Sequence, residues 1–281
     1  MKFLIHIIPI FLFLSCDNDV DQILFSSNQN GNSDIFLMDE EGNIKKQISD
    51  NPYEEWSPVW INNKEVSFLR QIENDISIVR KDLDTNIETK IPHPSNCIID
   101  DKNIIYSNGG KAMLFVCNGN IFYKLQEKET EVNLTANMNG QSNYLEWVDE
   151  NSFLFTNNQE GNNEIYLFNL VDQSVSRLTD NLANDERGSI SPDGKYLLFS
   201  SNRIDSNNQE ILLMNLNTRE IKNISNSDGN ELIARWNKNG QTIYFGSNKD
   251  GNWEIYSYDL KTSKTKRLTN NKAFDGDPRI K

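Results

Sequence analysis

The stretch that decides the fold is Ser247-Asn248-Lys249-Asp250-Gly251-Asn252-Trp253-Glu254-Ile255-Tyr256, which has the form of a strand end, a glycine-bearing turn and the start of the next strand. Near copies recur along the chain. They lie at residues 27–36, 156–166 and 201–212, a looser copy ends at residue 76, and a shortened one covers residues 117–122. A segment that is seen six times indicates a repeat architecture, and this must be recognised before any local motif is interpreted.

A phenylalanine ends a short apolar run just before each copy, and these phenylalanines give the period of the repeat. They are Phe25, Phe68, Phe115, Phe155, Phe199 and Phe245. The steps between them are 43, 47, 40, 44 and 46 residues, which is the spacing expected for four-stranded propeller blades. We predict that each run is the second strand of its blade, because short β-branched and aromatic runs bounded by Asn, Gly and Ser are typical strands.

The other strands of each blade follow from their position and composition. Third strands are expected after the repeated turn, at residues 35–38, 76–79, 121–124, 165–168, 211–214 and 255–258. Fourth strands, with the Lys and Arg typical of an outer edge, are expected at 46–49, 89–91, 132–135, 176–179, 222–225 and 266–269. The innermost first strands are shorter and weaker, and we expect them at 58–60, 104–107, 144–147, 188–191, 233–236 and 278–280.

The order of strands at the two ends predicts a closed ring. The repeats start with a second strand at Ile23 and finish with a first strand at Ile280, so the last segment can complete the first blade. Closure of this kind leaves no free sheet edge between the two ends. We therefore expect an all-β protein, a six-bladed β-propeller of four-stranded antiparallel blades over residues 22–281, without a second domain.

The repeat also resembles a known family. Ser191-Pro192-Asp193-Gly194-Lys195, the run from Phe199 to Arg203, Glu210-Ile211 and the Leu-Thr strand endings resemble the propeller repeat of TolB, a periplasmic bacterial protein. The resemblance covers about residues 21–281. It implies a six-bladed fold, an exported location and a binding platform, although some propellers of similar type belong to peptidases or sugar lyases. The separate N-terminal domain of TolB has no counterpart here, so the resemblance leaves a role in the Tol system open.

The N-terminus has the form of a secretory signal. Lys2 precedes an apolar run from Phe3 to Leu14, which is shorter than the ~20 residues that a membrane-spanning helix needs. The run ends in Phe13-Leu14-Ser15-Cys16, which resembles a bacterial lipobox. We expect a signal peptide at residues 1–15, lipid on Cys16 and a tether at residues 16–21. The alternative is an ordinary cleaved signal with an incidental cysteine, and the membrane and leaflet stay open.

Composition and charge exclude some classes of function. The formal net charge is −13, which argues against a nucleic-acid partner because phosphates need Lys and Arg. The only histidines are His6, inside the signal, and His93, in a loop between blades. A single histidine cannot form an imidazole metal cluster, and neither a Gly-x-Ser-x-Gly elbow nor a Walker loop is present. We expect a protein without catalytic activity and without a bound cofactor.

Two cysteines map to the third blade. By strand order, Cys97 and Cys117 lie near the same rim of the ring. An exported protein can form a disulfide, but a bridge requires a Cα separation of ~4.4–6.8 Å, and the period-based map is too coarse to measure it. We favour two reduced, partly buried thiols and keep the disulfide as the alternative.

Acidic residues in the expected loops before the inner strands are the best functional lead. They are Glu54 and Glu55 with Trp56, Asp185 with Glu186, Asp228 with Glu231, and Asp275 with Asp277. If these loops gather around the central channel, their carboxylates would hold a divalent cation or a partner that carries Lys or Arg, and Trp56 would add an aromatic anchor. The alternative is that they cap turns and satisfy loop amides.

Another set of acidic residues opens the third strands, and it recurs too regularly for a unique site. These residues are Asp34, Asp75, Glu164, Glu210 and Glu254. We interpret them as part of the hydrogen bonding of the repeat itself.

The sequence therefore favours a monomeric, lipid-anchored, non-enzymatic binding or scaffold protein of the bacterial envelope, facing the periplasm or the cell surface. It would engage a protein partner through the channel face. The alternative is a surface lipoprotein that binds or cleaves carbohydrate, and a third candidate is a structural envelope protein without a ligand.

Overall fold

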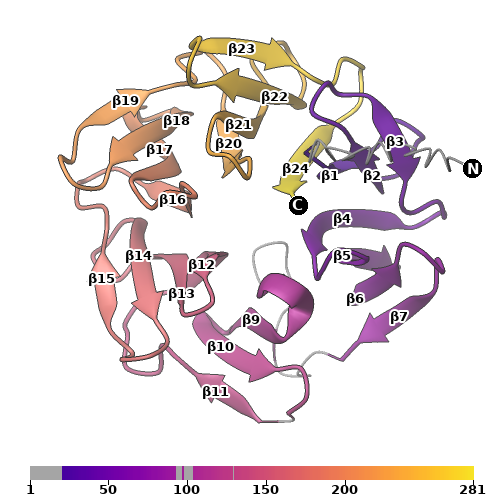
Figure 1. Cartoon of the computed structure of the whole chain (residues 1–281), viewed down its shortest axis with the longest axis horizontal. Coiled ribbons are helices and arrows are strands. Elements are labelled where there is room, and N and C mark those ends of the chain that lie inside the picture. The colour runs from indigo at the N-terminus through magenta and orange to yellow at the C-terminus, as the bar shows by residue number, and fades with distance from the viewer. Residues whose placement is uncertain (1–20, 93–96, 98–103, 129) are drawn as a thin grey trace, which may run out of the picture.

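Six four-stranded antiparallel sheets form a closed ring (Figure 1). This computed structural model describes residues 21–92, 97, 104–128 and 130–281. The predicted all-β, six-bladed propeller is confirmed. Cys16, the signal segment and His93 lie outside the described residues, as does most of the loop before the third blade.

The strands of each blade run in order from the channel outwards. Blade 1 has β24 (Asp275–Ile280), β1 (Ile23–Ser27), β2 (Asp34–Met38) and β3 (Ile44–Gln47). Blade 2 has β4 (Glu54–Trp60), β5 (Glu65–Ile72), β6 (Asp75–Asp82) and β7 (Glu88–Ile91). Blade 3 has β8 (Ile104–Tyr106), β9 (Ala112–Cys117), β10 (Asn120–Leu125) and β11 (Glu131–Asn133), and the short helix η1 (Asn108–Gly110) joins β8 to β9.

The second half of the ring repeats this order. Blade 4 has β12 (Ser142–Asp149), β13 (Ser152–Asn157), β14 (Glu164–Asn169) and β15 (Val175–Arg177). Blade 5 has β16 (Asp185–Ile190), β17 (Tyr196–Asp205), β18 (Asn208–Asn215) and β19 (Ile221–Asn223). Blade 6 has β20 (Glu231–Trp236), β21 (Thr242–Ser247), β22 (Glu254–Asp259) and β23 (Lys264–Arg267).

The ring closes as the sequence predicts. The C-terminal strand β24 pairs antiparallel with β1, with Ile280 opposite Ile23 and Asp275 opposite Ser27. The C-terminus consequently ends beside the central opening in Figure 1. Closure removes the free edge that an open array of blades would present between its first and last sheets.

Second strands form the core between blades. All six repeat phenylalanines are at most 1% exposed, and full burial of such a side chain contributes about 1.5–3 kcal/mol to folding. Clusters of apolar side chains span neighbouring blades, and in one of them Ile23 and Phe25 of blade 1 pack with Tyr244 and Ile255 of blade 6. The repeat therefore specifies both the blades and the contacts between them.

The Leu-Thr endings have a physical role. The hydroxyl oxygen that follows the outer strand accepts a hydrogen bond from the first isoleucine N–H of the third strand, at 2.8–2.9 Å in five blades. The five acceptors are Ser49, Thr135, Thr179, Ser225 and Thr269. These hydroxyl residues lie just past the outer strands, so those strands end earlier than the sequence pattern predicts.

The inner strands also differ from the prediction, because most of them begin two to four residues earlier. β4 begins at residue 54 instead of 58, β16 at 185 instead of 188, and β20 at 231 instead of 233. Most acidic residues that were expected in entry loops therefore lie in strands. Their ladder partners, which a local pattern cannot reveal, extend the strands.

Cys97 and Cys117 are joined by a disulfide, with their Cα atoms 4.9 Å apart. This differs from the favoured pair of reduced thiols. Cys117 is the last residue of β9, and Cys97 lies close enough to it for a bond. The period of the repeat gives the strand positions and does not define a distance between two such residues.

None of the described residues forms a helix that is long and apolar enough to cross a membrane.

Candidate functional site

Five of the six inner strands carry the same irregularity. In each, two residues lie opposite a single residue of the second strand, and that single residue is the repeat phenylalanine. The first residue of each pair has a positive φ, between 52° and 59°. These residues are Ser57, Tyr144, Arg187, Ile233 and Asp277. Two residues opposite one define a β-bulge, which bends a strand and re-aims a side chain.

The bulge is part of the propeller scaffold. A positive φ is uncommon outside glycine and is an outlier for a β-branched residue such as Ile233, and a residue held in this region costs about 1–3 kcal/mol. Its recurrence in five blades shows that the surrounding ladder imposes it. Pro58 and Pro278 follow the bulge residue in two blades, in agreement with the confinement of proline to bulges and edges within sheets.

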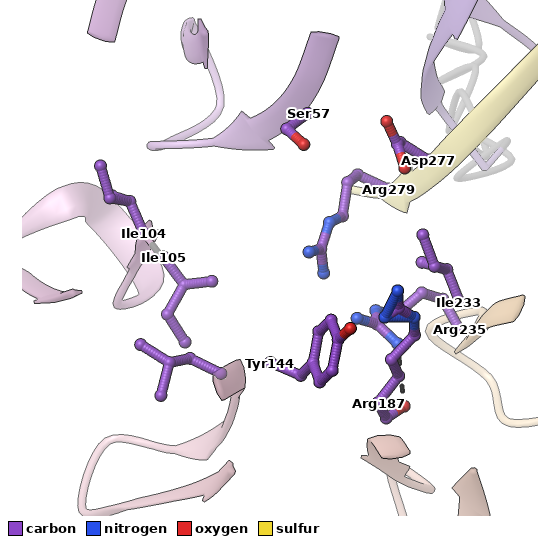
Figure 2. Close-up of a pocket in the computed structure, with 10 residues that line it drawn as sticks. Ser57, Ile104, Ile105, Tyr144, Arg187, Ile233, Arg235, Asp277 and Arg279 are labelled. Atoms are coloured by element: carbon purple, nitrogen blue, oxygen red, sulfur yellow. Dashed lines mark hydrogen bonds between the residues drawn. The ribbon is translucent and has the colours of Figure 1, made fainter. Parts of the chain in front are cut away.

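All five bulge residues line one narrow cavity in the channel (Figure 2). Blade 3, whose described inner strand has no bulge, contributes Ile104 and Ile105 to the wall. Arg235 and Arg279, each two residues beyond a bulge, also reach the cavity. Its volume is about 30 Å³, which is room for about two or three water molecules. We call this cavity the constriction.

Glu146 of blade 4 spans the channel to reach two arginines. Its Oε2 accepts hydrogen bonds from Arg279 Nη1 at 2.9 Å and lies 3.1 Å from Arg235 Nη2. Arg279 belongs to blade 1, which lies across the ring from blade 4 in Figure 1, and Arg235 belongs to blade 6. One carboxylate oxygen therefore links three blades through the centre of the propeller.

Arg235 is held rigidly. Its side chain is buried, and Nη1 donates to the carbonyl oxygens of Ala234 at 2.8 Å and Arg187 at 3.4 Å. Burial lowers the pKa of Arg235 to about 10; Glu146 acts to raise this pKa, whereas Arg279 and Arg187 add to the lowering. The guanidinium group therefore stays charged at neutral pH, and its bonds position the carboxylate of Glu146.

Arg187 contacts an aromatic ring, whereas Arg235 and Arg279 contact Glu146. Its guanidinium carbon is 3.8 Å from the centre of the Tyr144 ring, a cation–π arrangement that Figure 2 shows at the edge of the constriction. Its Nε is buried and has no hydrogen-bond partner within the described part of the chain, and the same holds for Nε of Arg235. Buried N–H groups normally have partners, so these two donors are exceptions among the described residues.

The channel widens on the side of the turns that join first and second strands. Two cavities of about 210 and 790 Å³ open there, and both contain Glu146, Trp147 and Arg279 in their walls. Indole groups at the ends of the inner strands line these cavities. Trp60 donates to the carbonyl oxygen of Arg279 at 3.2 Å, and Trp236 donates to that of Ser189 at 3.1 Å. We call the two cavities together the mouth.

Four of the carboxylates that the sequence proposed for the channel are buried inside the blades instead. Glu55, Asp185, Glu231 and Asp275 have no exposed surface. Glu55 pairs with Arg70 and Asp185 with Arg203. Ser227 and Ser247 donate to Glu231 at 2.5 and 2.6 Å, and Asn271 donates to Asp275 at 2.7 Å. Their positions fit the alternative, in which acidic residues satisfy the polar groups of the repeat.

The other predicted residues are dispersed over several blades. Glu54 is exposed and accepts the Ser33 N–H at 3.0 Å, Glu186 accepts from Asn163 at 2.5 Å, and Asp228 is exposed in a loop. Trp56 is partly buried within β4. Asp277 alone of the nine lies in the constriction, where it accepts a hydrogen bond from Ser26 at 3.2 Å.

Buried carboxylates meet in pairs between neighbouring blades. Asn181 donates to both Glu164 of blade 4 and Asp185 of blade 5, at 3.4 and 2.7 Å. At the interface of blades 1 and 2, burial and, to a smaller extent, the nearby Glu55 raise the pKa of Asp34 to about 6. This agrees with the interpretation that the acidic residue opening a third strand belongs to the repeat, although Asp75 of blade 2 is exposed.

Within the described ranges, no three His, Cys, Asp or Glu side chains are grouped so that they could hold a metal ion. The divalent cation in the channel stays a prediction.

The fold and the bulged inner strands define the chain as a six-bladed β-propeller with a charged central channel. No family model matches the chain. It is similar to the structure of TolB from Acinetobacter baumannii, with a TM-score of 0.78 and 19% identity over 92% of this chain and 66% of that one. A protein assigned as TolB from Agrobacterium tumefaciens gives a TM-score of 0.69 and 16% identity, over 91% of this chain and 89% of that one.

Propellers of enzymes are similar as well. An oligogalacturonate lyase in complex with manganese has a TM-score of 0.59 and 12% identity over 89% of this chain and 74% of that one. The tricorn protease of Thermoplasma volcanium is 22% identical over 86% of this chain, which spans about a fifth (22%) of the length of that protease. Identities at this level show a shared fold, and the resemblance of this chain to TolB-type propellers is confirmed at that level.

Sequence reasoning missed the residues that form the channel centre. Tyr144, Glu146, Arg235 and Arg279 belong to inner strands with weak patterns, and nothing in the period shows which of their side chains face the channel. Pro58 and Pro278 were the available signals, because proline within a strand indicates a bulge.

Proposed function

We propose that this chain is a non-enzymatic binding protein of the bacterial cell envelope, held to a membrane by lipid on Cys16, and that a protein partner occupies its channel. The observation that supports this most directly is the set of five bulges. The backbone is the same in each, but the side chains are Ser57, Tyr144, Arg187, Ile233 and Asp277. A regular scaffold that presents five different groups to one cavity is suited to recognition.

The shape of the channel supports a protein segment as the occupant. A mouth of several hundred Å³ leads to a constriction of about 30 Å³, so a partner can insert a narrow segment and rest a wider part on the rim. Sites of this kind are concave, with a few polar groups that fix orientation. The exported location and the monomeric state belong to the same proposal.

A blocked channel tests this proposal. Ser57→Trp places a large side chain at the constriction, whereas Ser176→Trp places the same side chain on the outermost strand of blade 4, where Ser176 is exposed. The two variants and the parent chain are used to capture partners from detergent-solubilised membranes. We expect a protein that the parent and Ser176→Trp retain and Ser57→Trp loses. Equal capture by all three chains would rule out the channel as the binding site.

Carbohydrate binding is the second candidate, and Trp147 favours it. This side chain lines the mouth, and its indole N–H is buried without a hydrogen-bond partner in the ranges that the structure describes. An indole next to polar groups is a suitable surface for a sugar ring. A glycan array distinguishes the two candidates, and glycan binding that Trp147→Leu abolishes, without capture of a protein, would favour this one.

A further inference from the structure

The centre of the channel is positively charged in a strongly acidic protein. Arg187, Arg235 and Arg279 outnumber the carboxylates of Glu146 and Asp277 there, although the whole chain has a net charge of −13. Arginine is suited to carboxylates because its planar group presents paired N–H donors. The centre of the channel therefore attracts an anionic group, whereas the acidic surface around it repels one.

Donors remain for a ligand at this point. A guanidinium group has five N–H donors, and the bond to Glu146 uses one of those of Arg279. In Figure 2 the guanidinium of Arg279 points toward the middle of the constriction. Arg187 also lines the constriction, where its guanidinium lies against the ring of Tyr144. Arg279 and Arg187 can thus donate to one anion from two sides, while Arg235 keeps its bonds to the main chain.

Glu146 shows which group the arginines accept. Its carboxylate reaches across the ring and is held by Arg279 and Arg235 through the same oxygen. The constriction is also small, about 30 Å³, so that a group of a few atoms fills it. A carboxylate on a slender stem meets this limit, whereas the carboxylate of a sugar acid is attached directly to a ring that the constriction cannot admit.

We propose that the constriction binds a single carboxylate from an acidic segment of a protein, and that Glu146 is an internal substitute that the incoming carboxylate displaces from Arg279. This inference rests on the proposed function, because it specifies the chemistry of the partner that the channel takes. The segment enters from the mouth, its carboxylate lies between Arg279 and Arg187, and its remaining residues contact the wall formed by Ile104 and Ile105.

Two substitutions with opposite expected effects test the inference. The probe is a short, fluorescently labelled glutamate–serine peptide with an amidated C-terminus, and its binding to the full-length chain in detergent is measured by anisotropy at low salt. Arg279→Gln removes a charged donor, so we expect binding about tenfold weaker or more. Glu146→Gln removes the competing carboxylate, so we expect binding about tenfold tighter.

Matched variants control for net charge. Glu150→Gln and Arg219→Gln make the same changes of charge at exposed positions, and we expect effects below about twofold. Arg187→Gln, whose side chain makes a ring contact in place of an ion pair, serves as a second variant if Arg279→Gln fails to fold. It should weaken binding as well.

Several results would overturn the inference. The first is that a peptide with glutamine in place of glutamate binds as tightly as the original peptide. The second is that the peptide binds neither the parent chain nor Glu146→Gln. The third is that Arg279→Gln binds the peptide more tightly than the parent chain does. Displacement of the peptide by an oligogalacturonate at lower concentration than the peptide itself requires would show that an acidic polysaccharide is the guest. The proposed function is tested separately by partner capture. Equal capture by Ser57→Trp and the parent chain would overturn it, and this result does not depend on the charge of the partner.

Discussion

Trp60 donates its indole N–H to the main-chain oxygen of Arg279 at 3.2 Å, although 219 residues separate them in the sequence. The bond joins the inner strand of blade 2 to the C-terminal strand that completes blade 1. Trp236 makes the same bond to Ser189 between blades 6 and 5. The indole groups therefore connect neighbouring inner strands around the channel, including the strand that closes the ring.

The first prediction concerns this closure. Trp60→Phe keeps an aromatic ring but removes the N–H, so we expect the free energy of unfolding to fall by about 1 kcal/mol and Tm to fall by about 2–4 °C. Calorimetry measures both. Trp253→Phe, where the ring packs near Gly246, should change Tm less, and an equal fall in the two variants would argue that only packing was lost.

The second prediction concerns the strain at the bulges. Ile233 has a φ of 59°, and a short polar side chain tolerates this conformation better than a β-branched one. Ile233→Asn should therefore raise the free energy of unfolding by about 0.5–1 kcal/mol. The same change at the neighbouring buried Ala234 should lower it. Chemical denaturation decides the matter, and a destabilised Ile233→Asn would show that apolar contacts of Ile233 outweigh its strain.

The third prediction is a dependence of stability on pH. Burial raises the pKa of both Asp34 and Asp275 to about 6, from an ordinary value of 3.8. Between these values the folded chain binds more protons than the unfolded chain, so stability falls as the pH rises through this window. We expect Tm to increase by a few degrees, about 3 °C, from pH 7 to pH 5.

At lower pH the trend should reverse. Hydrogen bonds from Ser191 and Lys195 hold the pKa of Asp193 at about 2, and the stabilisation from such groups is lost as they become protonated. Asp275→Asn should reduce the gain in Tm between pH 7 and pH 5, whereas Asp228→Asn at an exposed position should leave it unchanged. A Tm that rises steadily from pH 5 to pH 7 would contradict this assignment.

The fourth prediction concerns the disulfide. Cys97 and Cys117 are 20 residues apart, and a loop of that length contributes about 3 kcal/mol by restricting the unfolded chain. Reductant should lower Tm by about 5–10 °C. The double variant Cys97→Ala with Cys117→Ala should have this reduced Tm both with and without reductant. If a maleimide reagent modifies both cysteines of the unreduced, denatured protein, the bond is absent.

The fifth prediction concerns the anchor, which lies outside the described residues. If lipid on Cys16 holds the protein, Cys16→Ala should move it from the membrane to the soluble fraction. The variant lacks the acyl chains, and the apolar run of residues 3–14 is too short to span a membrane. Fractionation followed by immunoblotting measures this. Retention of the variant on membranes would show that another attachment operates.

The blade scaffold could be predicted because its signals are local. Phe25, Phe68 and their equivalents each end an apolar run next to an Asn-containing turn, and both features lie within ten residues of each other. Hydrophobic runs and turn residues report on strand positions directly. The inner strands were placed less accurately, since Glu55 and Asp185 gain their strand conformation from partners on the second strand.

The candidate site could not be predicted in the same way. Glu55 and Asp275 were expected at the channel and are instead buried, whereas Tyr144 and Arg235 were not expected there and line it. A bulge adds one residue to a strand, and a shift of one residue moves every later side chain to the other face. The side chains that face the channel therefore depend on a feature that strand pairing reveals in five blades and that proline signals in only two of them.

The sequence by itself determined the number of blades, the order of strands and the closure of the ring, because a period of about 44 residues and the two chain ends contain that information. Only the tertiary structure decided what the channel presents. Glu146 and Arg279 are 133 residues apart and meet across the ring, and their contact depends on the radius of the closed propeller and on five bulges. Distances across a closed ring are set by all blades together, so no local segment encodes them.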